Sequence, residues 1–253
     1  MPLSYFKTLV RRLLRTSGYQ IQKYPDVSFS SLPVFDMSVR LLMASRGPAL
    51  NFIQVGANDG RYGDPLYKYV MMYPWRGILV EPQPDIYANL CANYASVRDR
   101  LIFENVAVAG SGAVIEMYKG ASAGTNNAAN ADHAASVVSV KPSVVASQLG
   151  LKTRDLVRFV VPCFTLDSLI EKHSMSSVDV LQIDTEGHDF SVLKTINLSA
   201  ISPSIIQFEH GHLAPREITD AVDYLSSSGY RVLYGGYQMD TIALHRSFLS
   251  SIA

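Results

Sequence analysis

The feature that most constrains the fold is an alternation of short apolar segments with segments of helical periodicity. Strands are expected at 51–55, 77–81, 101–106, 178–183 and 204–208. Helices are expected at 65–72, 84–94, 165–173, 190–196 and 215–228. This order predicts an α/β fold, a mostly parallel sheet with helices on both faces. In such sheets ligands bind at the carboxyl ends of the strands.

The last two apolar segments, 231–234 and 241–244, follow one another without a helix between them. They predict an antiparallel hairpin at one edge of the sheet, which completes seven strands. Residues 113–118 and 159–164 are predicted as additional strands.

The chain divides into an N-terminal helical extension, residues 1–48, and a main domain, residues 49–253. Within the main domain, residues 119–150 are predicted to be a lid or substrate loop. Their first half consists largely of Ala, Ser, Asn and Gly and cannot form a core element.

Residues 1–24 contain five basic residues and no acid, and their apolar residues recur at helical spacing. This helix has three expected roles: packing on the domain, a homodimer contact, or a peripheral contact with an anionic membrane.

Composition excludes little else. Basic and acidic residues number 22 each, so charge gives no argument for nucleic acid as a partner. The two cysteines form no disulfide framework, and no apolar run reaches membrane-spanning length. The expected location is cytoplasmic, with membrane-peripheral as the alternative.

A glycine-bounded loop follows the first strand of the main domain: Gly56, Ala57, Asn58, Asp59 and Gly60. Small residues at this point let backbone amides approach a ligand. The spacing differs from the Gly-x-Gly-x-x-Gly of dinucleotide-binding folds. It suits S-adenosylmethionine (SAM), which has no phosphate and whose amine and carboxylate could meet loop groups and Asp59.

Two further strand ends complete a nucleoside-binding pattern. Glu81, followed by Pro82, ends the second strand about 20 residues after the loop, where an acid can accept both ribose hydroxyls. Asn105, Val106 and Ala107 end the third strand and are predicted to border the adenine.

The sequence resembles the FkbM-type methyltransferases. The resemblance rests on blocks in 54–60, 75–82, 105–108, 165–169 and 183–187, and covers roughly 50–245. It implies a class I methyltransferase, Rossmann-like fold, SAM as cofactor, and O-methylation of a hydroxyl on a sugar, glycan or secondary metabolite. Many class I enzymes have an acid where Gln54 stands, so amine recognition is expected to rest on Asp59 or Asp184.

The acceptor chemistry is predicted for the ends of the next two strands. Asp184 and Glu186 point to one side of an extended segment. His210, His188 and Asp184 are the catalytic candidates, because a histidine can accept the proton of the attacking hydroxyl. His212 and His133 are weaker candidates. No metal is favoured; if Mg²⁺ binds, its ligands are expected to be Asp184, Glu186 and Glu209.

Two other functions remain as alternatives. One is a nicotinamide-dependent oxidoreductase on a similar sheet. The other is a non-catalytic, membrane-associated module that keeps a nucleoside pocket. The favoured hypothesis is an O-methyltransferase that acts by in-line transfer with general-base assistance on a small-molecule or glycan acceptor.

Overall fold

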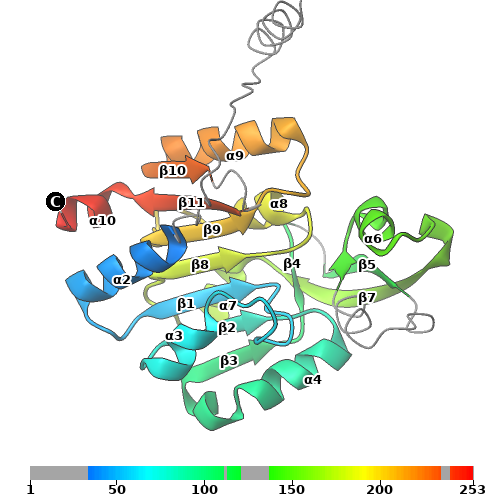
Figure 1. The fold of residues 1–253 in the computed structure, drawn as a ribbon, viewed down its shortest axis with the longest axis horizontal. Coiled ribbons are helices and arrows are strands. Elements are labelled where there is room, and N and C mark those ends of the chain that lie inside the picture. Colours follow the sequence, from blue (N-terminus) through cyan, green and yellow to red (C-terminus); the bar gives the residue numbers. More distant parts are fainter. Residues whose placement is uncertain (1–33, 111–112, 121–136, 235–239, 253) are drawn as a thin grey trace, which may run out of the picture. The chain divides into compact units, whose positions relative to one another are not determined.

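The computed structural model describes residues 34–110, 113–120, 137–234 and 240–252 (Figure 1). Its centre is a seven-stranded sheet in the order β10-β11-β9-β8-β1-β2-β3. The strands are β1 (Asn51–Val55), β2 (Arg76–Val80), β3 (Leu101–Glu104), β8 (Val180–Ile183), β9 (Ile205–Glu209), β10 (Tyr230–Tyr234) and β11 (Asp240–His245). The predicted fold class is confirmed.

Five strands of this sheet are parallel, and the hairpin at its edge reverses direction. β11 pairs antiparallel with β9 on one side and with β10 on the other, so β10 is the outermost strand. β1 lies centrally between β2 and β8, with Val55 opposite both Val80 and Ile183. The carboxyl ends of three strands therefore meet where the glycine loop begins.

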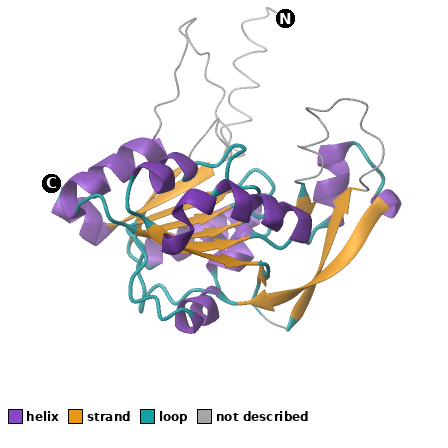
Figure 2. Cartoon of the chain, turned by 90° about the horizontal axis from the view of Figure 1, so that it is seen from below, coloured by secondary structure: helices purple, strands orange, loops and turns teal. Residues whose placement is uncertain are grey.

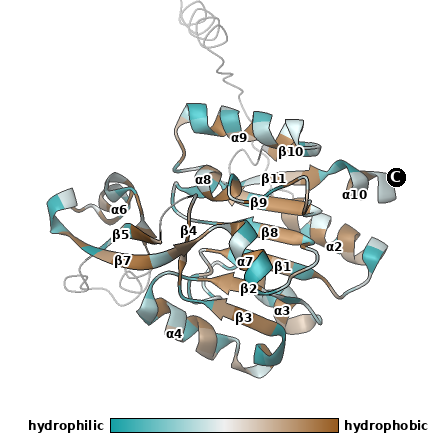
Figure 3. Cartoon of the chain, turned by 180° about the vertical axis from the view of Figure 1, so that it is seen from behind, coloured by the Kyte–Doolittle hydropathy of each residue, from teal (hydrophilic) through white to brown (hydrophobic). Residues whose placement is uncertain are grey.

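Helices cover both faces of the sheet (Figure 2). One face packs against α2 (Val34–Arg46), α3 (Tyr67–Met72), α4 (Pro84–Asn93) and α10 (Arg246–Ser251). The other packs against α7 (Leu166–Lys172), α8 (Asp189–Leu193) and α9 (Pro215–Ser227). Side chains along a strand alternate between the two faces. Phe52 packs against the helices of the first face, whereas Ile53 and Val55 pack against those of the second. In Figure 3 the central strands are hydrophobic, and α7 and α9 carry hydrophilic residues.

A second sheet lies beyond the carboxyl ends of the central strands (Figure 1). Its order is β4-β7-β5-β6. The strands are β4 (Ala107–Val108), β5 (Val114–Gly120), β6 (Val138–Ser139) and β7 (Leu156–Phe164). β5 and β7 form a long antiparallel pair from Val114–Pro162 to Gly120–Leu156. The two additional strands predicted from sequence are these, and the sheet that they build was not foreseen.

Part of the segment predicted to be a lid has regular structure. β6 is followed by α6 (Pro142–Leu149), which ends at Gly150 in the left-handed conformation and buries Val145 and Ala146. Residues 121–136, with the candidate His133, lie outside the described residues, as do residues 1–33 with the predicted basic helix. None of the described helices could cross a membrane.

The remaining elements are short. The 3₁₀ helices η1 (Ala95–Arg100) and η2 (Thr153–Asp155) precede β3 and β7. Arg100 donates hydrogen bonds to the carbonyl oxygens of Val70, Tyr73 and Trp75, and so satisfies the end of α3.

Candidate functional site

A cavity of about 850 Å³, counted with its open mouth, lies at the carboxyl ends of β1, β2 and β8. The second sheet forms one of its walls. From the central sheet and its loops it is lined by Gln54, Val55, Gly56, Ala57, Asn58, Tyr62, Gly63, Asp64, Pro65, Val80, Glu81, Pro82, Gln182, Asp184, Thr185, Glu186 and His188. Val106, Ala107, Val108, Ile115, Met117, Val138 and Val140 complete the lining with apolar groups.

The glycine loop is folded by its own hydrogen bonds. The amides of Gly56 and Ala57 both donate to the carbonyl oxygen of Val80, at 3.0 Å each. The amide of Gly60 donates to Ala57, and that of Asn58 to Glu81. The amide of Asp59 donates to the side chain of Asn58. The structure differs here from the expectation that loop amides are free for a ligand, because all five already have an acceptor.

Asp59 and Gly60 do not line the cavity. The Asp59 carboxylate accepts the amides of Arg61 and Tyr62 at 2.9 and 2.8 Å, which is the local turn bonding typical of this residue type. Gly60 lies against Leu90 and Tyr94, where a Cβ would come within 2.5 Å of both side chains. Both residues therefore shape the loop from the side away from the cavity.

Glu81 is the buried carboxylate of the cavity, with 3% of its surface exposed. Its two oxygens accept the amides of Asn58 at 3.0 Å and Gln83 at 2.8 Å. Burial nevertheless raises its pKa to about 7, although these two hydrogen bonds act in the opposite direction. Asn105 lies outside the cavity and holds the backbone at Glu81, because its side-chain amide donates to the Glu81 carbonyl oxygen at 2.8 Å.

Asp184 directly follows β8 on the cavity floor. The residue is exposed toward the cavity, while protein groups surround its carboxyl group on the other sides. This enclosure raises its pKa well above the ordinary value, and the negative charges of Asp189, Glu186, Asp240 and Glu81 raise it further. A positive charge close to Asp184 would therefore stabilise the ionised form of its carboxyl group.

The loop after Asp184 is held by a fully buried acid, Asp189. Asp189 accepts hydrogen bonds from the amide and hydroxyl of Thr185 and from the amide of Gly187. Burial raises its pKa to about 7. Glu186, at the turn of the loop, has a φ of 53°, in the left-handed region that non-glycine residues rarely adopt. The loop is thereby fixed with the Glu186 side chain facing the cavity.

The two catalytic candidate histidines have different positions. His188 lines the cavity, and its Nε2 is buried without a hydrogen-bond partner among the described residues. Burial lowers its pKa, as does the charge of Lys141, so its imidazole is neutral at pH 7. His210 is outside the cavity lining, and its Nδ1 lies 3.0 Å from the Thr241 hydroxyl. The geometry thus favours His188 over His210 as a group that meets a ligand.

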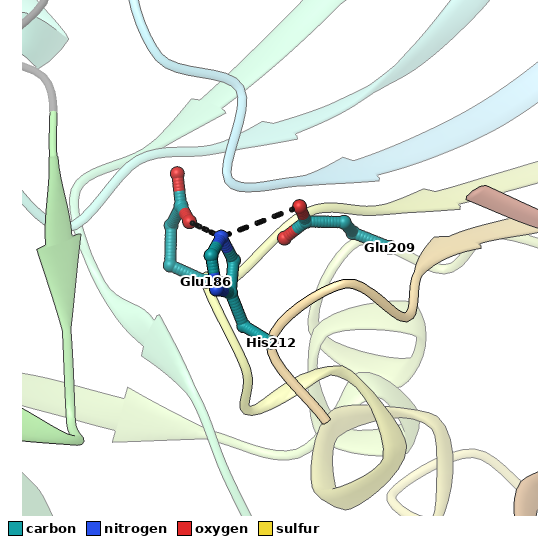
Figure 4. Close-up of side chains that lie close together, drawn as sticks. All are labelled: Glu186, Glu209 and His212. Atoms are coloured by element: carbon teal, nitrogen blue, oxygen red, sulfur yellow. Dashed lines mark ion pairs between the residues drawn. The ribbon is translucent and has the colours of Figure 1, made fainter. Parts of the chain in front are cut away.

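A third histidine, His212, joins two carboxylates beside the cavity (Figure 4). Its Nε2 lies 3.2 Å from Glu186 Oε2 and 3.6 Å from Glu209 Oε1. These three ligand atoms lie within 4.8 Å of one another and could hold a metal ion. Asp184, which the sequence had grouped with Glu186 and Glu209, is not a member of this cluster. The cluster was missed because His212 lies in the loop after β9, whose path no sequence pattern defines.

Two buried glutamines line the cavity, and the sequence analysis assigned neither of them a role in binding. Gln54 is 2% and Gln182 is 4% exposed, and they lie opposite one another on β1 and β8. The amide nitrogen of Gln54 donates to Asp64, while the side-chain oxygens of Gln54 and Gln182 have no hydrogen-bond partner in the part of the chain that the structure describes. Polar residues in otherwise apolar strands were the available signal for a site at this position.

The comparisons with known proteins agree with this geometry. The model of the FkbM methyltransferase domain family matches residues 54–232, more than half of the chain. A search of curated protein sequences finds no significant match.

Among solved structures, the FkbM methyltransferase of Methylobacillus flagellatus KT is similar, with 12% identity and a TM-score of 0.50. The alignment covers 78% of this chain and only 44% of that one. The METTL16 methyltransferase domain has 11% identity, a TM-score of 0.47 and coverage of 94% and 78%. The N-terminal domain of human METTL16 in complex with SAH has 11% identity, a TM-score of 0.44 and coverage of 93% and 79%.

At such low identity the first of these structures supports the fold alone. Neither family nor fold favours a nicotinamide-dependent oxidoreductase or a non-catalytic nucleoside-binding module. The family model covers more than half of the chain, which therefore belongs to the FkbM methyltransferase domain family.

Proposed function

We propose that the chain transfers the methyl group of SAM to a hydroxyl oxygen of a sugar, glycan or secondary metabolite. The observation that carries this proposal is the neutral His188, which lines the same cavity as Glu81 and Asp184 and whose buried Nε2 has no hydrogen-bond partner among the described residues. A proton acceptor beside a cofactor cavity suits an acceptor that must lose a proton as it attacks.

In this proposal the cofactor's nucleoside lies against β2 and the second sheet. Glu81 accepts hydrogen bonds from the ribose hydroxyls through lone pairs that its two backbone contacts leave free. The adenine packs between Pro82, Val106 and Ala107 on one side and the apolar residues of the second sheet on the other. The family supplies SAM as the cofactor, and these roles are assigned from the position of each residue in the cavity.

The methyl group needs little activation, because a sulfonium is already an electrophile. The protein has to hold the acceptor oxygen in line with the methyl carbon at about 3 Å. Asp184 and Glu186 face this part of the cavity, and their charges complement the sulfonium. His188 takes the proton when the new carbon–oxygen bond forms.

The acceptor is proposed to reach the cavity past the segment 119–150. Ser139 donates to the Glu186 carbonyl oxygen at 2.8 Å, and the Gln148 side-chain nitrogen lies 2.7 Å from His212 Nε2. The described residues Ser139 and Gln148 of this segment are therefore in contact with the loops that carry Glu186 and His212. A hydroxyl-bearing small molecule or glycan fits this polar side of the cavity; the membrane and homodimer roles of the N-terminal helix remain predictions.

The test is transfer of labelled methyl from SAM into an extract of the source organism, followed by identification of the labelled product. We expect a product methylated on oxygen, formed by the wild type and lost with Glu81→Gln. A product methylated on nitrogen or carbon would contradict the proposed acceptor class and leave the family assignment intact. A protein that binds neither SAM nor its product would contradict the proposed function itself.

A further inference from the structure

The cavity concentrates acidic side chains in a chain whose formal net charge is zero. Four carboxylates line it: Asp64, Glu81, Asp184 and Glu186. Within the described part of the chain, no lysine or arginine contributes to the lining. The imidazole that does contribute, that of His188, is neutral at pH 7. A ligand inside this cavity therefore experiences a field that favours positive charge.

The uncharged polar groups of the cavity also favour a positively charged ligand. The side-chain oxygens of Gln54 and Gln182 are buried, and none of the described residues supplies them with a hydrogen bond. The orientation of Gln54 follows from chemistry, because Asp64 can only accept and the Gln54 nitrogen must therefore face it. Its oxygen is directed away from that carboxylate. With the amides of 56–60 already bonded, the floor presents acceptors rather than donors.

Charges around the lining do not reverse this balance. Asp189 and Asp240 lie close enough to Asp184 to raise its pKa, whereas Glu209, with a pKa of about 9, is uncharged at pH 7. On the other side, Lys141 and Lys194 are near His188. Lys141 is itself paired with Glu217, at 3.2 Å. The nearby carboxylates outnumber these cations.

We infer that this site distinguishes the cofactor from its product by charge, with Asp184 as the main determinant, so that SAM binds more tightly than S-adenosylhomocysteine (SAH). The inference rests on the proposed function. SAM and SAH share the adenosine, the amine and the carboxylate, and differ by one methyl group and one positive charge. A difference in their affinities therefore isolates the effect of the field on the sulfonium.

The consequence for the reaction is release of product inhibition. Transfer of the methyl group turns the sulfonium into a neutral thioether, and the attraction to Asp184 is lost at that step. Two unit charges about 4 Å apart interact substantially even when the surroundings are strongly polarisable. The product is then bound only by the contacts that it shares with the cofactor, and it leaves more readily.

The experiment is titration calorimetry of the full chain with SAM and with SAH at pH 7. We expect SAM to bind at least about tenfold more tightly than SAH, beyond the roughly fourfold that one buried methyl group contributes. Asp184→Asn should bring the affinity ratio down to the methyl contribution.

The matched control is Asp85→Asn on α4, which removes a carboxylate whose side chain is 86% exposed and lies outside the cavity. It should keep the wild-type ratio. Equal or tighter binding of SAH by the wild type, or a ratio unchanged by Asp184→Asn, would overturn the inference while leaving cofactor binding in place. Absence of binding by both ligands would instead overturn the proposed function, and this inference with it. Thermal unfolding of each variant establishes that it is folded.

Discussion

Gly56 lies directly against the backbone of Asp184: a Cβ atom on Gly56 would be 1.7 Å from the Asp184 carbonyl oxygen. The contact follows from the pairing of β1 with β8, in which the Asp184 amide donates to the Val55 carbonyl oxygen at 2.9 Å. The first residue of the glycine loop and the acid on the cavity floor are thus held together as one unit. Cofactor binding and acceptor chemistry share this floor.

The first prediction concerns this contact. Gly56→Ala should lower the free energy of unfolding by several kcal/mol and reduce SAH affinity, because the new methyl group meets backbone that cannot move without separating β1 from β8. Gly56 also has a φ of 77°, which adds about 1 kcal/mol for any other residue. The measurements are denaturant unfolding and calorimetry.

Gly150→Ala is the matched control, since Gly150 has a φ of 64° but no atom within 4 Å of the position that a Cβ would take. Its free energy of unfolding should fall only by the conformational contribution, about 1 kcal/mol, and its affinity for SAH should equal that of the wild type. Equal losses in the two variants would show that the contact with Asp184 is unimportant.

The second prediction is that Glu81→Gln weakens SAH binding by tenfold or more. The variant keeps the shape of the side chain but replaces one accepting oxygen by a donor, so it loses acceptor capacity toward the ribose and one of its two backbone contacts. Calorimetry with SAH measures this effect. Affinity within twofold of the wild type would exclude Glu81 as a ribose ligand.

The same variant should change how stability depends on pH. In the folded protein the pKa of Glu81 is about 7, above its ordinary 4.5, so the folded state holds a proton that the unfolded state releases first. This group therefore lowers stability as pH rises from about 4.5 to 7. Glu81→Gln lacks the titration, and its stability relative to the wild type should increase across that window. Thermal unfolding of both proteins between pH 4.5 and 8 is the measurement; a constant difference would contradict the raised pKa.

The fold was predictable because its signal is local and repeated. Each central strand is a short apolar run, and the alternation with helices leaves few arrangements of the chain. Strand ends were equally informative: Gly56, Glu81 and Asp184 all line the cavity, as expected from parallel strands ending at one edge. The hairpin at 230–245 could be predicted because no helical segment separates its two strands in the sequence.

Contacts between distant loops were not predictable in the same way. Asp59 and Glu81 are both acids near a strand end, yet local turn bonding directs Asp59 away from the cavity. His212 meets Glu186 because a close approach at Gly187 brings the two loops together. Ile115 and Met117 reach the cavity only because β5 and β7 form a second sheet beside it. Such relationships depend on packing between segments, which a sequence pattern does not encode.

The third prediction separates the histidines. His188→Gln should lower the rate of methyl transfer by about 10² to 10⁴ and leave SAM affinity near the wild-type value. The wild-type rate should rise with pH and level off below pH 7, because the pKa of His188 is lowered from its ordinary 6.5. The variant should lack that rise.

His210→Gln is the control, because its ring contacts Thr241 rather than the cavity. It should keep both the rate and the pH profile in protein shown to be folded by thermal unfolding. The opposite pattern, with loss of the pH-dependent rise only in His210→Gln, would assign the base to His210.

The last prediction is that no metal is required, although Glu186, Glu209 and His212 could supply ligands. The Nε2 atom of His212 already contacts both carboxyl groups, at 3.2 Å from Glu186 and 3.6 Å from Glu209. Burial and the neighbouring acids also raise the pKa of Glu209 to about 9, so this carboxyl is protonated at pH 7 and needs no cation. Methyl transfer measured after prolonged dialysis against EDTA should equal that of untreated enzyme, and added Mg²⁺ or Mn²⁺ should not increase it. A loss of rate that Mn²⁺ restores in the wild type, but not in His212→Ala, would instead establish a metal site at this cluster.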